Sequence, residues 1–129
     1  MQKVLIVDDS RTMRNIQKNV LTKLFPECQM TEAGDGLEAI TVLASGATFD
    51  LILADWNMPN MDGFKMVCKI REKDKTTPII MVTTEAEKPR IIEAIKAGVN
   101  NYCIKPFTPD VLAEKIKQTL DKARTPVTT

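Results

Sequence analysis

The sequence predicts an α/β domain of the (βα)5 type, a doubly wound fold with five parallel strands in one sheet and helices on both faces. Apolar runs of strand length recur about every 25 residues. The segments between these runs carry apolar residues at helical spacing. The chain has 129 residues, 43% hydrophobic and 27% charged, which is the balance of a single globular domain. An all-helical bundle would leave the regularly spaced strand-like runs unexplained.

Five runs are expected to form strands, because each is short and bounded by charged residues, proline or glycine. They cover residues 4–7, 28–32, 51–54, 79–82 and 102–104. Three of them are continuous apolar runs, as expected for strands of a parallel sheet that is covered on both faces. The run 28–32 alternates between apolar and polar residues, so we place it at or near an edge of the sheet.

Five helices are expected between and after these strands, on both faces of the sheet, because crossovers between parallel strands are right-handed. Their apolar stripes are Met13, Ile16, Val20, Leu21 and Leu24; Leu37, Ile40 and Leu43; Phe64, Val67 and Ile70; Ile91, Ile92 and Ile95; and Leu112, Ile116, Leu120 and Ala123. Pro89 suits a first helical turn, and Gly46 and Gly98 lie where helices should end. We expect one domain over residues 1–124 and a short tail over residues 125–129.

Composition excludes several classes of function. The net charge of +1 provides no general attraction to nucleic acid or to an anionic membrane, so we expect no direct DNA binding. The chain has no histidine, which excludes Ser-His-Asp and Cys-His mechanisms and histidine-containing metal sites. Three widely separated cysteines indicate a reducing compartment, and we expect a cytoplasmic protein. No apolar run approaches the roughly 20 residues of a membrane span, so we expect no membrane insertion, and the first run is too short for a signal peptide.

Polar residues follow four of the predicted strands at the points where the strands end. They are Asp8-Asp9, Asp55, Thr83-Thr84 and Lys105-Pro106. Ligands of open α/β sheets bind beyond the carboxyl ends of the strands, so we expect these residues to converge at one site. Each residue alone has an ordinary explanation as a helix cap, a turn residue or a solvated lysine. The joint pattern is much more specific.

The chemistry of this pattern favours phosphoryl transfer. Crowded carboxylates repel one another, and Mg²⁺ prefers carboxylate, carbonyl and water oxygens. A carboxylate can attack phosphorus, and the transfer depends mainly on positioning and charge neutralisation. Mg²⁺ and the ammonium group of Lys105 would neutralise the phosphoryl group from two sides, and a threonine hydroxyl would donate to a third oxygen. The sequence therefore predicts an aspartate that becomes phosphorylated, with Mg²⁺ as cofactor.

These residues, in this order, resemble the signature of the response-regulator receiver domains of two-component signalling. The resemblance spans nearly the whole chain, and the segment from Ala54 to Gly63 is particularly similar to that of the stand-alone chemotaxis regulators. It implies the flavodoxin-like strand order 2-1-3-4-5. It also implies a signalling protein rather than an enzyme, one that catalyses only its own phosphorylation and dephosphorylation.

The resemblance assigns roles at the phosphoryl and metal site. Asp55 would accept the phosphoryl group. Asp9, Asp55 and the backbone carbonyl of Asn57 would ligate Mg²⁺ directly, and Asp8 would act mainly through metal-bound water. Lys105 would contact the phosphoryl group or, in the unphosphorylated protein, the carboxylate of Asp55. The peptide bond between Lys105 and the proline that follows it is expected to be cis.

The resemblance also implies a switch and a control of phosphoryl lifetime. Thr83 would move toward the phosphoryl group, and Tyr102 would turn inward as Thr83 moves. Asn57 and Glu85 would flank the approach of water and help to set the lifetime. Thr84 stands where the family usually has alanine or glycine, so its branched side chain is expected to restrict access to phosphorus.

Output is expected to pass through partner proteins, with the chain itself a monomer. Because this chain has no histidine, a phosphohistidine donor must be another protein, a histidine kinase that is CheA-like if the pathway is chemotaxis. The downstream target, for example a flagellar motor switch protein, would contact the fourth helix, fifth strand and fifth helix around Lys88, Ile91, Tyr102 and Lys115. Glu87 and Ser10 depart from the chemotaxis pattern and weaken a motor-specific assignment.

Three alternatives remain open at this point. A receiver domain can act as a phosphorelay shuttle that passes its phosphoryl group to a histidine phosphotransfer protein. A phosphatase of the haloacid-dehalogenase kind needs a second acid two residues after its nucleophile, where this chain has Asn57. A flavodoxin-like electron carrier needs a hydroxyl- and glycine-rich loop after the first strand, where Asp8 and Asp9 would repel the FMN phosphate.

Overall fold

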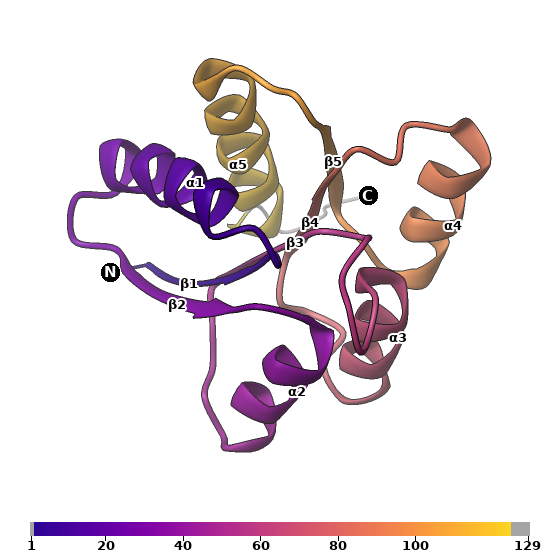
Figure 1. The fold of residues 1–129 in the computed structure, drawn as a ribbon. Coiled ribbons are helices and arrows are strands. Elements are labelled where there is room, and N and C mark those ends of the chain that lie inside the picture. The colour runs from indigo at the N-terminus through magenta and orange to yellow at the C-terminus, as the bar shows by residue number, and fades with distance from the viewer. Residues whose placement is uncertain (1, 125–129) are drawn as a thin grey trace.

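Five parallel strands form the central sheet of the computed structural model, which describes residues 2–124 (Figure 1). In chain order the elements are β1 (Lys3–Val7), α1 (Arg11–Leu24), β2 (Gln29–Ala33), α2 (Gly36–Ala44), β3 (Leu51–Ala54), α3 (Gly63–Lys73), β4 (Ile79–Thr83), α4 (Lys88–Ala97), β5 (Asn101–Ile104) and α5 (Pro109–Arg124). The strand order is β2-β1-β3-β4-β5, and all four pairings are parallel. The predicted fold, strand order and edge position of β2 are confirmed. The predicted tail, residues 125–129, lies outside the described residues.

Helices cover both faces of the sheet, with α1 and α5 on one face and α2, α3 and α4 on the other (Figure 1). Successive residues of a strand point to opposite faces. Leu5 of β1 and Ile52 of β3 therefore pack toward α2, α3 and α4, whereas Ile6 and Leu53 pack toward α1 and α5. Both faces of the central strands are buried, which explains their continuous apolar runs. Within residues 2–124, no helix is both long and apolar enough to cross a membrane.

Helix α4 is rotated relative to the predicted apolar stripe. Ile92 and Ile95 are 44% and 48% exposed. The buried stripe consists of Ala94, which is fully buried, with Ile91 and Ala97 partly buried against the core. The two stripes have the same spacing, so periodicity alone does not distinguish them. The small side chain at Ala94 allows this face of the helix to approach the sheet.

In helix α1, one residue of the predicted apolar stripe is exposed, and a neighbouring polar residue is buried. Ile16 was expected in the core and is 38% exposed, whereas Gln17 is 1% exposed and lies on the face that also buries Val20 and Leu21. The side-chain amide of Gln17 has no hydrogen-bond partner among residues 2–124. A buried polar residue at a core position is not expected from a hydrophobic pattern.

The loop after β3 depends on a close backbone approach at the start of α3. A Cβ atom at Gly63 would lie 2.0 Å from the carbonyl oxygen of Asp55, which only glycine avoids. The Gly63 N–H donates to the carbonyl of Trp56 at 2.8 Å, and the side chain of Asp62 caps the helix at the N–H of Lys65. These contacts fix the chain on both sides of Asp55.

Candidate functional site

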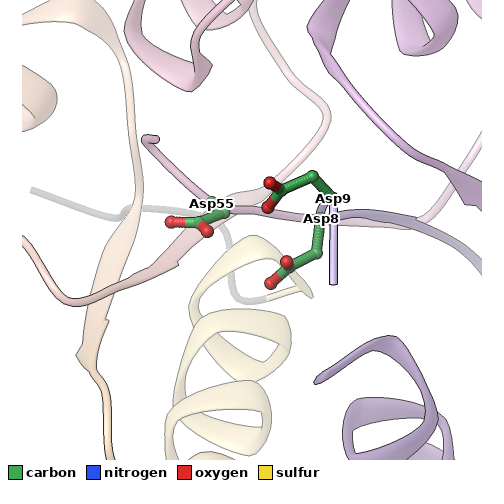
Figure 2. Close-up of side chains that lie close together, drawn as sticks. All are labelled: Asp8, Asp9 and Asp55. Carbon is green, nitrogen blue, oxygen red and sulfur yellow. The ribbon is translucent and has the colours of Figure 1, made fainter. Parts of the chain in front are cut away.

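The polar residues predicted to converge do meet at the carboxyl end of the sheet. Asp8 and Asp9 follow β1, Asp55 follows β3, Thr83 ends β4 and Lys105 follows β5. Figure 2 shows the three aspartates gathered at the ends of the two adjacent strands β1 and β3. Each aspartate offers a carboxylate oxygen, and these oxygens lie within 4.8 Å of one another.

Lys105 forms ion pairs with two of the three carboxylates. Its Nζ lies 2.8 Å from Asp8 Oδ2 and 3.1 Å from Asp55 Oδ2, and the peptide bond to Pro106 is cis, as the resemblance implied. Burial of Lys105 would lower its pKa, but the two carboxylates raise the pKa above its usual value. The lysine therefore stays charged. Its pairing with Asp8 was not expected from the sequence.

Asp8 is held by contacts to both its side chain and its backbone. It is 1% exposed, and this burial raises the pKa of its carboxyl despite hydrogen bonds from Lys105 and from the N–H of Ser10 at 2.9 Å. Arg14 donates to the Asp8 carbonyl at 2.6 Å and to Glu32 at 2.9 Å. No sequence signal points to Arg14, because its role depends on how α1 lies beside β2.

Asp55 is 7% exposed and has a partner at each carboxylate oxygen. The backbone N–H of Trp56 donates to Oδ1 at 2.7 Å, and Lys105 binds Oδ2. Trp56 is itself fixed, because its ring stacks on Phe64 with centroids 5.4 Å apart. The contacts of both oxygens therefore hold the Asp55 carboxylate in one orientation.

The donor set fits a divalent cation that prefers oxygen. Octahedral Mg²⁺ with ligands at about 2.0–2.1 Å brings its oxygens roughly 3–4 Å apart, close to the spacing of these carboxylates. The carboxylate of Asp9 makes no hydrogen bond or ion pair with any other residue in 2–124 and is exposed, so it is open to a cation. Three carboxylates and one paired ammonium leave two net negative charges, which one divalent cation neutralises.

A hydrogen-bonded path connects Thr83 to Tyr102 through the backbone of Glu85. The hydroxyl oxygen of Thr83 accepts from the N–H of Glu85 at 3.3 Å, and the hydroxyl of Tyr102 donates to the Glu85 carbonyl at 2.7 Å. Tyr102 is buried, so its ring already lies inward in this structure. Burial and the charges of Glu85 and Asp55 raise the pKa of Tyr102 to about 12.

The residues expected to influence phosphoryl lifetime lie together at the rim of the site. The side-chain amide of Asn57 donates to the carboxylate of Glu85 at 3.2 Å, which joins the loop after β3 to the loop after β4. Thr84, between Thr83 and Glu85, is exposed. The sequence indicated these positions but not the Asn57–Glu85 hydrogen bond.

The four residues expected to form the partner face differ in how exposed they are. Lys88 is exposed and Lys115 half-buried, but Ile91 packs partly against the core and Tyr102 is buried. The large apolar side chains that are exposed on α4, β5 and α5 are Ile92, Ile95, Ile104 and Val111.

The fold and this arrangement of three aspartates, threonine and lysine define a receiver domain. The chain belongs to the response regulator receiver domain family, whose model matches residues 4–117. It is 50% identical to a chemotaxis protein CheY homolog of Campylobacter jejuni over 120 residues, 92% of each chain. It is also 50% identical to chemotaxis protein CheY1 of Helicobacter pylori, over 92% of this chain and 96% of that relative.

Solved structures give the same result. The chemotaxis response regulator CheY4 of Vibrio cholerae is 36% identical, with a TM-score of 0.83 over 92% of this chain and 98% of that one. A CheY-like receiver domain protein from Methanospirillum hungatei is 29% identical, with a TM-score of 0.85 over 95% of this chain and 96% of that one. The chain is therefore a CheY-like signalling domain, and the phosphatase and electron-carrier alternatives are not adopted.

Proposed function

We propose that this protein is a single-domain response regulator that accepts a phosphoryl group on Asp55 and then changes its affinity for a downstream protein. One observation carries the proposal. A half-buried, charged Lys105 bridges Asp8 and Asp55 beside the open carboxylate of Asp9. This arrangement offers a nucleophile, a cation site and a fixed positive charge at one point.

In the proposed reaction, a carboxylate oxygen of Asp55 attacks phosphorus, and the nitrogen–phosphorus bond of a phosphohistidine donor breaks. Bound Mg²⁺, held by Asp9, Asp55 and the Asn57 carbonyl, with Asp8 acting through water, would neutralise charge on the phosphoryl oxygens. Lys105 would leave the Asp55 carboxylate to bind a phosphoryl oxygen, while its contact with Asp8 keeps it near. The N–H of Trp56 holds the carboxylate in place for attack.

We infer a role in chemotaxis from the relatives, several of which are named chemotaxis proteins. The phosphodonor would be a CheA-like histidine kinase, and the target a protein such as the flagellar switch, in the cytoplasm. We propose that the target binds α4, β5 and α5 near Lys88, Tyr102 and Lys115, over the exposed apolar residues Ile95 and Ile104. Such apolar patches are typical of interaction sites.

Mg²⁺ is expected to change the fluorescence of Trp56 in the millimolar range. Trp56 is the only tryptophan of the chain, and its N–H binds the carboxylate that would ligate the metal. The measurement is an emission titration of the wild type and of Asp9→Asn, which should need far more Mg²⁺. A flat titration of the wild type would contradict the metal site.

Thr84→Ala is expected to lose its phosphoryl group several-fold faster than the wild type. The branched side chain lies at the exposed rim, where it would hinder water, whereas alanine leaves the approach open. The comparison is the decay of the alkali-labile acyl phosphate after the donor is removed, with Thr84→Val as a control of similar shape. Equal decay of wild type and alanine variant would exclude shielding by Thr84.

A further inference from the structure

Helix α4 is held to the domain by few contacts along its length. Ala94 is its only buried residue, and the first three residues, Lys88 to Arg90, are exposed. The N-cap residue of α4, Glu87, makes no side-chain capping hydrogen bond. A helix with so little buried surface is a segment of low local stability. Apart from the partial packing of Ile91 and Ala97 against the core, its position therefore depends on the polar and aromatic contacts at its two ends.

The carboxyl-terminal end of α4 is firmly attached through Arg71 of α3. The guanidinium donates to the carbonyl of Gly98 from Nε at 3.1 Å and from Nη2 at 2.9 Å, and to Asn100 Oδ1 at 3.0 Å. It also donates to the carbonyls of Asp74 and Thr77. Gly98 has φ of 115° and lies so close that a Cβ atom would be 2.8 Å from Arg71 Nε. This end of the helix has little freedom to move.

At the amino-terminal end of α4, Ile91 packs partly against the core, and a second contact leads toward Asp55. The guanidinium carbon of Arg90 lies 5.3 Å from the centroid of the Trp56 ring, within the range of a cation–π interaction. The backbone N–H of Trp56 donates to Asp55 Oδ1 at 2.7 Å, and the Trp56 ring stacks on Phe64. Arg90 also forms a weak, exposed ion pair with Glu93 in the next turn of α4, with Nη1 and Oε2 3.7 Å apart.

We propose that Arg90 couples the first turns of α4 to the state of Asp55 through the ring of Trp56. With its far end fixed by Arg71, the helix can respond to the site mainly at its first turns. A change at Asp55 reaches Trp56 through the shared hydrogen bond, and the contact with Arg90 transmits it to α4. The hydrogen bond and the cation–π contact of this route include neither Thr83 nor Tyr102. It deepens the proposed function, because phosphorylation is the change at Asp55 that it would transmit.

The test is hydrogen–deuterium exchange of the amides in the first two turns of α4. Arg90→Met keeps the apolar stem and removes the cation, and we expect exchange to rise about 2- to 5-fold, the value of an exposed cation–π contact. Arg90→Lys should restore most of the protection. Lys96→Met, an equivalent change at an exposed cation in the last turn, should behave as the wild type. Equal exchange in Arg90→Met and wild type, or in Arg90→Met and Arg90→Lys, would overturn the proposal.

Coupling to Asp55 is tested by adding Mg²⁺ and beryllofluoride, which mimics the acyl phosphate. Exchange in α4 should change in the wild type and change less in Arg90→Met. Binding of beryllofluoride without any such difference would overturn the coupling. If beryllofluoride does not bind, the proposed function fails and Asp55→Ala decides the coupling instead. It removes the acceptor of the Trp56 N–H, so it should raise exchange in α4 when Arg90 is present but not in the Arg90→Met background.

Discussion

Asp55→Asn is expected to reduce phosphoryl labelling to background while the fold remains intact. Asparagine has nearly the same shape and keeps an oxygen for the N–H of Trp56, but its amide is not a nucleophile toward phosphorus. Lys105 keeps its ion pair with Asp8 at 2.8 Å, so the substitution does not leave a buried ammonium unpaired.

The same variant should be as stable as the wild type or more stable without Mg²⁺. One fewer carboxylate in a cluster of three relieves repulsion, a gain of up to about 1 kcal/mol, or roughly 4 °C in melting temperature. Labelling uses acetyl phosphate or a phosphohistidine donor, with Asp110→Asn on the first turn of α5 as the control. Labelling of Asp55→Asn at the level of this control would refute the nucleophile assignment.

Thr83→Ala is expected to accept the phosphoryl group on Asp55 yet lose most of the resulting increase in partner affinity. The buried phosphoryl group cannot touch a protein on the outer surface of α4, so an element with two states must carry the signal. The Thr83 hydroxyl accepts the Glu85 N–H, and the Glu85 carbonyl accepts the Tyr102 hydroxyl. Movement of Thr83 toward a phosphoryl oxygen would therefore be transmitted through the Glu85 backbone to Tyr102.

The enhancement expected in the wild type is about 1–3 kcal/mol, or roughly 5- to 150-fold in affinity. The measurement is the affinity of the protein for its downstream target protein, with and without beryllofluoride. Thr83→Ser keeps the hydroxyl and should keep most of the enhancement, which separates the hydrogen bond from the packing of the methyl group. Full enhancement in Thr83→Ala would show that another route, such as Arg90 and Trp56, carries the signal.

The fold could be predicted because two strong periodic signals agree along the whole chain. Runs such as residues 51–54 are continuous and apolar because β3 is buried on both faces, and Gly98 marks the end of α4 with a left-handed conformation. The rotation of α4 could not be predicted, since Ile92 and Ile95 have the same spacing as the buried stripe. Only packing against the sheet decides between the two faces.

The site could be predicted because its residues occupy the first positions after strands whose ends must meet. Asp8, Asp55 and Lys105 are brought together by topology alone, which a sequence pattern can reveal. Arg14 and Arg90 act from helix surfaces, and their partners are distant in sequence or on another element. Their roles depend on side-chain positions that no spacing rule specifies, so an arginine there looks like an ordinary solvated charge.

Phosphorylation of Asp55 is tested most directly by locating the phosphoryl group in the protein. The wild type would be incubated with a phosphodonor and Mg²⁺ and reduced with borohydride, which converts an aspartyl phosphate to homoserine that mass spectrometry locates. We expect homoserine at position 55, formed only when Mg²⁺ is present. Modification of Asp8 or Asp9 in place of Asp55, or no modification with an active donor, would contradict this expectation.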